Sequence, residues 1–163
     1  MQLTLKTILN LKEKHQDFVY RDIRLNNKRI EVNVEPRKRS RAVCSGCGER
    51  CPGYDKLPQR EFLHVPIWGV SVILLYCARR VSCATCGVIS EQVPWSIGKS
   101  PVTIAYAWFL SEWAKLLSVQ EVARQFKISW HHVFSGVAMA VSWGRTRVDL
   151  TNITALGVDE IYW

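Results

Sequence analysis

Cys44-Ser-Gly-Cys47-Gly and Cys83-Ala-Thr-Cys86-Gly are two copies of one pattern, Cys-x-x-Cys-Gly, with 35 residues between Cys47 and Cys83. Two residues between cysteines let both sulfurs of a tight turn face a single tetrahedral ion, and the glycine that follows permits the positive φ that such a turn requires. Two of these turns supply four sulfurs, which is the ligand set of a closed, structural zinc site. Cys44, Cys47, Cys83 and Cys86 are therefore the predicted zinc ligands.

Two other chemistries use closely spaced cysteines. A thioredoxin-like redox motif needs one Cys-x-x-Cys at a junction of strand and helix, whereas this chain has two copies, each in a glycine-containing turn. A disulfide framework belongs to secreted domains. The N-terminus has Lys6 inside its apolar segment and no small-residue cleavage site, so it does not resemble a signal peptide. The reducing cytosol is the expected compartment, and zinc is the preferred interpretation of the two knuckles.

Two cysteines lie outside the knuckles. Cys51 follows Cys47 by four residues, so it could replace a ligand or support a second site, although a bystander is the simpler interpretation. Cys77 lies within an apolar segment that is predicted to be a strand. Free cysteine is among the residues most often buried, so Cys77 is expected to be a small buried apolar side chain.

The residues between the knuckles have the character of β-strands. Residues 60–66 and 70–81 are predicted strands, and Ile67-Trp68-Gly69 is the turn between them. Such an arrangement, with knuckles at hairpin ends and a sheet between them, is typical of a zinc ribbon. Residues 18–25 and 29–34 alternate in part between apolar and polar side chains, and they are expected to lengthen this sheet.

Two smaller elements complete this part of the chain. Asn26-Asn27 supplies turn chemistry between the first two predicted strands. Residues 1–11 are predicted to form a short helix that covers the sheet.

Charge and composition favour a globular chain with a polyanionic partner. The 163 residues are 48% hydrophobic with a formal charge of +8, and 14 of the 22 Lys and Arg residues fall within residues 1–60. The densest cationic run is Arg37-Lys38-Arg39-Ser40-Arg41, which suits a loop along a phosphate backbone, although short basic runs are also common as solvated turns. The longest apolar run, residues 68–78, is too short to span a membrane.

The residues after Pro94 change to a helical period. Pro101 suits the first turn of a helix whose apolar stripe runs to Leu117. Ser118-Val-Gln-Glu121 has the form of a capping box and opens a short second helix. Lys127-Ile128 is the predicted turn, and Ser129 is the expected N-cap of a third helix. This order indicates a helix-turn-helix, with a plain three-helix packing unit as the alternative.

If the motif binds DNA, the exposed face of its second helix approaches the bases. The candidate contacts to bases on this helix are Trp130, His131, His132 and Ser135. The candidate contacts to phosphates are Arg124 and Lys127 beside the helix, and Arg37, Lys38, Arg39 and Arg41 in the basic loop. For the two histidines, a surface position without any contact is an equally open interpretation, because few side chains of a recognition helix reach bases.

The last residues, 152–163, form an apolar, β-prone segment that contains Asp159-Glu160. Adjacent carboxylates in an apolar strand are costly unless a cation meets them, so a metal ligand and a solvated strand end are both open on local grounds.

The order of these parts resembles the N-terminal third of bacterial insertion-sequence transposases of the IS-L-three type. The likeness rests on the two knuckles, the Arg79-Arg80-Val-Ser-Cys83 approach to the second one, the helix-turn-helix and Leu156-Gly-Val-Asp-Glu160, and it covers the chain from about Leu3 to Trp163. It implies that the zinc and helical segments bind the terminal inverted repeats of the element. It also implies that Asp159 corresponds to the first of three catalytic carboxylates of an RNase-H-like core that holds Mg²⁺.

The predicted fold class is α+β. A β-rich zinc ribbon (residues 1–95) precedes a helix-turn-helix region (101–147) and the orphan first strand of a catalytic core (152–163). On this interpretation the chain is a truncated transposase that binds double-stranded DNA, and it is not an enzyme on its own, because the partner carboxylates of Asp159 are missing. Its cofactor is structural zinc, with Mg²⁺ expected only for a complete family enzyme, and its location is the bacterial cytoplasm, associated with the nucleoid.

Two alternatives remain open at this point. A stand-alone transcription regulator would use the same zinc ribbon and helix-turn-helix. An interaction module would associate with itself or with full-length transposase and interfere with it, through the apolar side chains of Val158, Ile161, Tyr162 and Trp163.

Overall fold

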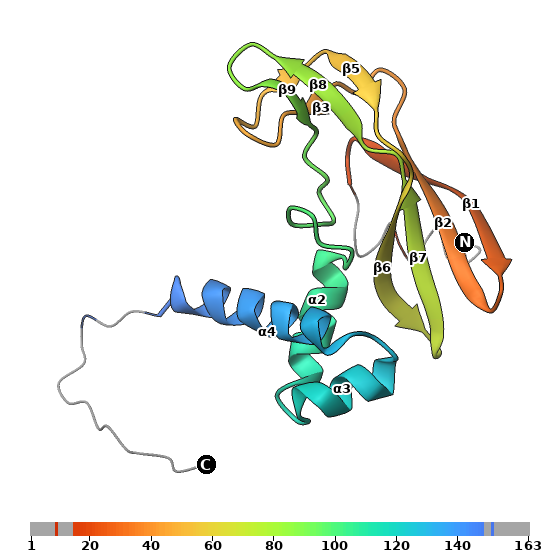
Figure 1. The fold of residues 1–163 in the computed structure, drawn as a ribbon, viewed down its shortest axis with the longest axis vertical. Coiled ribbons are helices and arrows are strands. Elements are labelled where there is room, and N and C mark those ends of the chain that lie inside the picture. Colours follow the sequence, from red (N-terminus) through yellow and green to blue (C-terminus); the bar gives the residue numbers. More distant parts are fainter. Residues whose placement is uncertain (1–8, 10–14, 149–150, 152–163) are drawn as a thin grey trace.

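The structure, a computed structural model, describes Leu9, residues 15–148 and Thr151. The strands are β1 (Phe18–Asn26), β2 (Arg29–Pro36), β3 (Ala42–Val43), β4 (Arg50–Cys51), β5 (Gly53–Lys56), β6 (Arg60–Ile67), β7 (Val70–Tyr76), β8 (Arg79–Cys83) and β9 (Gly87–Ser90), and the helices are α2 (Ile104–Trp113), α3 (Val119–Phe126) and α4 (Trp130–Arg145). Sheets make up one end of the molecule and its middle, and the helices make up the other end (Figure 1). The predicted α+β class is confirmed.

Four strands form the larger sheet, in the order β1-β2-β7-β6. Two antiparallel hairpins, β1–β2 and β6–β7, are joined by parallel pairing of β2 with β7. The first two predicted strands thus extend the sheet of the β6–β7 hairpin, as expected. The turn of the first hairpin is Asn27-Lys28, one residue later than predicted, because Asn26 pairs with Arg29.

An aromatic cluster forms the core against one face of this sheet. Trp95, 1% exposed, lies at its centre, and the rings of Phe18, Phe62 and Tyr76 each meet it edge-on with centroids 4.9, 6.0 and 5.1 Å away. Edge-to-face contacts of this kind stabilise a core beyond the area that they bury. Leu9, which belongs to the predicted N-terminal helix, is also buried in this core; residues 1–8, 10 and 11 of that prediction lie outside the described residues.

The zinc-ribbon end consists of two smaller sheets. One has the order β5-β8-β9, and the other pairs β3 with β4. The predicted continuous strand 70–81 is wrong in this respect, because it divides at Cys77-Ala78 into β7 and β8, which belong to different sheets. At this break the N–H of Leu57 donates to the Ala78 carbonyl over 2.8 Å. Cys77 is consequently half-buried, not fully buried as predicted.

A buried ion pair joins the two sheet regions. Glu91, 3% exposed, accepts hydrogen bonds from the Arg79 guanidinium at 2.6 and 2.9 Å, from the Arg79 backbone N–H at 2.6 Å and from the hydroxyl of Tyr76. Glu91 also forms a backbone bridge with Cys44 of the first knuckle. The carboxylate therefore links the aromatic core, through Tyr76, to the knuckle, and sequence reasoning did not identify it.

Helix α2 is anchored to the edge of the larger sheet. The N–H of Leu63 in β6 donates to the Pro101 carbonyl over 2.7 Å, and the N–H of Thr103 donates back to the Leu63 carbonyl over 2.9 Å. Thr103 is the N-cap of α2, and its hydroxyl accepts from the Tyr106 N–H. Pro101 therefore precedes the helix, contrary to the prediction, because residues 101–103 add a short extended segment to the exposed edge of β6.

Helices α3 and α4 follow with the caps that the sequence predicted. The Ser118 hydroxyl accepts from the Glu121 N–H, and the Glu121 carboxylate accepts from the Ser118 N–H, which completes the capping box. Ser129 occupies the N-cap position of α4 but makes no side-chain cap hydrogen bond. Helix α4 crosses α2 at Gly136, where an added Cβ would lie 2.7 Å from the Ala107 carbonyl oxygen. Only glycine lets the two backbones approach so closely.

Candidate zinc centre and nucleic-acid interface

The two knuckles converge on one point. Cys44 and Cys47 lie in the loop between β3 and β4, whereas Cys83 ends β8 and Cys86 precedes β9. All four sulfurs lie within 4.8 Å of one another, and the sulfurs of Cys47 and Cys83 are 3.5 Å apart. Sulfurs that hold one tetrahedral Zn²⁺ at bond lengths of about 2.3 Å are separated by about 3.8 Å. The arrangement therefore fits a closed four-sulfur zinc site, and structural zinc is the cofactor of this ribbon.

Glycines shape both knuckles. Gly48 and Gly87 have φ of 78° and 73°, as the Cys-x-x-Cys-Gly pattern predicted. Gly46 has a role that the pattern did not reveal, because a Cβ at this position would lie 2.9 Å from the sulfur of Cys86. A side chain at residue 46 would thus occupy space beside the sulfur cluster.

Hydrogen bonds at the cluster shift the pKa values of its thiols in opposite directions. Backbone N–H groups of Cys86 and Thr85 lower the pKa of the Cys83 thiol to about 6. A hydrogen bond with Cys44, together with burial, raises the pKa of the Cys86 thiol to about 12. Four thiolates this close repel one another unless a cation lies among them, and Zn²⁺ provides that charge. The chemistry of the sulfur cluster is therefore that of metal binding.

Cys51 lies in the same small core without joining the cluster of four. It packs with Cys44 and Cys83, and its sulfur lies 3.6 Å from the Glu49 carbonyl oxygen. Burial raises the pKa of its thiol to about 11. These contacts are those of a buried apolar neighbour of the zinc site.

The turn of the helical unit has a left-handed residue at its centre. Lys127 has φ 52° and ψ 44° and ends α3, and the N–H of Ile128 donates to the Ala123 carbonyl over 3.0 Å. The buried side chains of Val122 and Val133 hold α3 and α4 together in the core of the helical unit. The predicted turn is in place, although glycine is the usual residue in this conformation.

The predicted DNA contacts on and before α4 divide into two groups. Trp130 and His131 lie on the exposed side of the first turn, with their rings stacked 3.7 Å apart. Ser135 is also exposed, and its hydroxyl donates to the His131 carbonyl. His132 differs from these residues because it is half-buried. Burial lowers the pKa of its imidazole, and the charge of the nearby His131 lowers it further.

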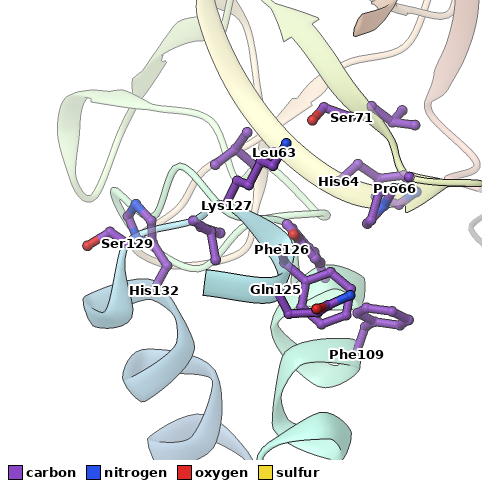
Figure 2. Close-up of a pocket in the computed structure, with 14 residues that line it drawn as sticks. Leu63, His64, Pro66, Ser71, Phe109, Gln125, Phe126, Lys127, Ser129 and His132 are labelled. Atoms are coloured by element: carbon purple, nitrogen blue, oxygen red, sulfur yellow. The ribbon is translucent and has the colours of Figure 1, made fainter. Parts of the chain in front are cut away.

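His132 lines a groove of about 510 Å³ between the sheet and the α3–α4 turn. Figure 2 shows Leu63, His64 and Pro66 of β6 on one side of this groove and Lys127 and Ser129 on the other. The turn of the helical unit therefore lies directly beside the β6–β7 hairpin.

The basic loop lies at the other end of the molecule. Arg37, Lys38, Arg39 and Arg41 are exposed between β2 and β3, next to the zinc ribbon. The guanidinium of Arg79 donates to the Ser40 carbonyl over 3.1 Å and so ties the loop to β8. The loop and α4 lie at opposite ends of the ribbon drawing (Figure 1).

Two predictions find no test in the described structure. Asp159 and the predicted strand 152–163 lie outside the described residues.

Among the residues that are described, the four cysteines are the only cluster of three or more side chains able to hold a metal. No helix in the described part of the chain is long and apolar enough to cross a membrane.

Comparisons with known proteins agree with the zinc site. Residues 40–86 match the zinc-finger of transposase IS204/IS1001/IS1096/IS1165. The chain is 29% identical over 119 residues to the transposase for insertion sequence element IS1001 of Bordetella parapertussis, an alignment that covers 72% of this chain and 29% of that protein. No solved structure matches the chain. The resemblance to the N-terminal part of IS-L-three-type transposases is confirmed.

Proposed function

We propose that this chain binds double-stranded DNA through the helix-turn-helix of α3 and α4, and that the DNA is the terminal repeat of a transposable element. The similarity to a transposase supports the class of DNA. Zn²⁺ held by Cys44, Cys47, Cys83 and Cys86 stabilises the ribbon, and it takes no part in chemistry because four thiolates leave no open position. The proposal assigns binding to the described residues.

The observation that carries this proposal is the exposed first turn of α4. A capped α3, a left-handed turn and a buried contact at Val133 place Trp130 and His131 on the solvent side. The N-terminal residues of a recognition helix are those that reach base edges in the major groove. Arg124 and Lys127 are exposed on the approach to this turn and suit phosphate contacts.

The basic loop supports a second contact area. Arg37, Lys38, Arg39 and Arg41 lie far from α4, at the ribbon end (Figure 1). Cations that meet phosphates add affinity with little sequence preference. A duplex long enough to reach from α4 to the ribbon is therefore expected to bind more tightly than one that covers α4 alone.

A gel-shift titration of the zinc-loaded chain tests the proposal. The probes are a duplex that carries candidate terminal repeats and a mixed-sequence duplex of the same length. Binding should weaken steeply as salt rises, because each neutralised phosphate releases counterions. A chain that binds neither duplex at low salt would disprove DNA binding, and equal affinity for both would remove the terminal repeat as the target.

Lys127→Gly separates a DNA contact from the fold. Glycine adopts the left-handed conformation of residue 127 more readily than lysine does, so the variant should fold at least as well. Loss of one phosphate contact should lower the slope of log affinity against log salt by about 1. Lys115→Ala, which removes an exposed cation in the turn between α2 and α3 that pairs with Glu112, is the matched control. An unchanged slope in Lys127→Gly would exclude this lysine from the interface.

Self-association is a second candidate function, supported by apolar side chains on α4. Phe134 and Val141 are more than half exposed and lie seven positions apart along the helix, which places them on one face. A row of this kind suits packing against the same helix of a second copy. Sedimentation of the wild type and of Phe134→Gln at increasing concentration tests it, and a wild type that stays monomeric would eliminate this candidate.

A further inference from the structure

Trp68 is an unusual residue for its position. It forms, with Gly69, the two-residue turn of the β6–β7 hairpin, because Ile67 pairs with Val70. Its φ is 50° and its side chain is 97% exposed, so the ring packs against nothing in the described chain. Turns of this type favour Asn-Gly, and a bulky residue at positive φ is rare. Neither packing nor turn geometry accounts for tryptophan here.

The second hairpin places cations beside this tip. Arg29 pairs with Ser71 in the parallel register, so the Asn27-Lys28 turn lies at the same end of the sheet as Trp68-Gly69 (Figure 1). Lys28 is exposed at its tip, and Arg24 is exposed on β1 just before it.

Two acidic side chains of these strands share one cation. Glu31 and Glu61 both pair with Arg29, at 2.6 and 3.0 Å. The end of the sheet that carries Trp68 therefore combines one exposed aromatic ring with the exposed cation Lys28, a combination that suits a polyanion better than an apolar partner.

The hairpin is held against the helix-turn-helix. Gly69 and Ser71 line the same groove as Gln125 and Lys127 at the end of α3 (Figure 2). Leu63 of β6 packs in the core that α3 and α4 share. The hairpin turn therefore lies beside the helical turn.

Building on the proposed DNA binding, we propose that the β6–β7 hairpin is a wing of the helix-turn-helix, and that Trp68 contacts the minor groove of the duplex whose major groove receives α4. Apolar side chains at such positions wedge against base steps, and aromatic rings stack on bases with little sequence preference. Lys28 meets the adjacent phosphates. The wing adds affinity, whereas α4 supplies the sequence preference.

Trp68→Asn tests the wing. Asparagine suits the left-handed turn better than tryptophan does, so the melting temperature should stay equal or rise. The ring is lost, and a base–aromatic contact is worth roughly tenfold in affinity. We expect about tenfold weaker binding to a mixed-sequence duplex at fixed salt, and Trp68→Phe should restore much of the loss. Leu116→Asn removes another exposed apolar side chain, 79% exposed and in the turn between α2 and α3, and should leave affinity unchanged.

The outcomes separate the wing from the proposed function. If the wild type binds DNA and Trp68→Asn binds equally well, the wing is wrong and the helix-turn-helix proposal stands. If the wild type does not bind DNA, both fail. If Trp68→Asn abolishes dimer formation in sedimentation while its affinity for DNA is unchanged, the tip serves contact between two copies and the wing is again wrong.

Discussion

The crossing of α2 and α4 depends on a glycine whose replacement has opposite local and tertiary effects. Gly136 lies in the middle of α4, where alanine is favoured over glycine by about 1 kcal/mol in helix propensity. A Cβ at this position would lie 2.7 Å from the Ala107 carbonyl oxygen and 3.3 Å from its Cα. These are backbone atoms of α2, so relief requires the two helices to move apart.

Overpacking of this kind costs about 1–3 kcal/mol, and more when backbone has to move. After the gain in propensity, Gly136→Ala should therefore destabilise the chain by about 1–2 kcal/mol. In a protein of this size, a loss of that order lowers the melting temperature by several degrees. Because α4 shifts on α2, its exposed first turn also moves relative to the β6–β7 hairpin, and DNA affinity should fall.

Gly144→Ala is the matched control. Gly144 lies in the same helix, but an added Cβ there would meet nothing within 4 Å. Only the propensity gain remains, of up to about 1 kcal/mol. Thermal unfolding followed by circular dichroism on the zinc-loaded chain measures both variants. If Gly136→Ala melts as high as Gly144→Ala, the close approach of the two helices is not real and the packing argument fails.

Three further predictions concern the zinc site, the buried ion pair and a helix cap. Cys86→Ser should lose stoichiometric zinc and melt in a chelator-insensitive way, whereas Cys77→Ser should keep its zinc, as elemental analysis would show. Glu91→Gln leaves the buried Arg79 without its counter-charge and should lower the free energy of unfolding by about 3 kcal/mol, as measured by denaturant titration. A loss of less than half of that would contradict the structural role of the ion pair. Ser118→Ala removes a cap worth about 1 kcal/mol. Hydrogen bonds from Ser118 lower the pKa of Glu121. The cap therefore stabilises the folded chain at pH values above the ordinary carboxyl pKa, and this stabilisation is lost as pH falls through the lowered pKa of Glu121. Ser118→Ala should lose less stability on acidification than the wild type does.

Features made by near neighbours in the chain could be predicted from the sequence. The knuckle glycines with positive φ, the capping box and the turn at Lys127 each follow from residues within five positions of one another. The two knuckles also identify their common site, because four thiols in two identical turns satisfy one ion. In these cases, the residue types and their spacing determine the local backbone conformation.

Predictions of strand ends and of solvent exposure were less secure. Residues 70–81 contain a continuous run of strand-forming side chains, yet the chain leaves one sheet and enters another at Cys77-Ala78. Pro101 suits a helix start, but the edge of β6 recruits residues 101–103 instead. His132 shares its local pattern with His131, although only the latter is exposed. Each difference arises because a partner distant in sequence competes with the local preference.

Residue types and spacing alone were enough to establish the α+β class, the zinc ligands and the order of ribbon and helices. Tertiary structure alone revealed that Gly136 meets Ala107, that Glu91 joins the aromatic core to the first knuckle and that Gly69, in the β6–β7 turn, lines one groove with Lys127. A local pattern constrains the conformation of the backbone over a few residues. It cannot state which distant atoms that backbone will meet, because those contacts depend on how the finished elements pack.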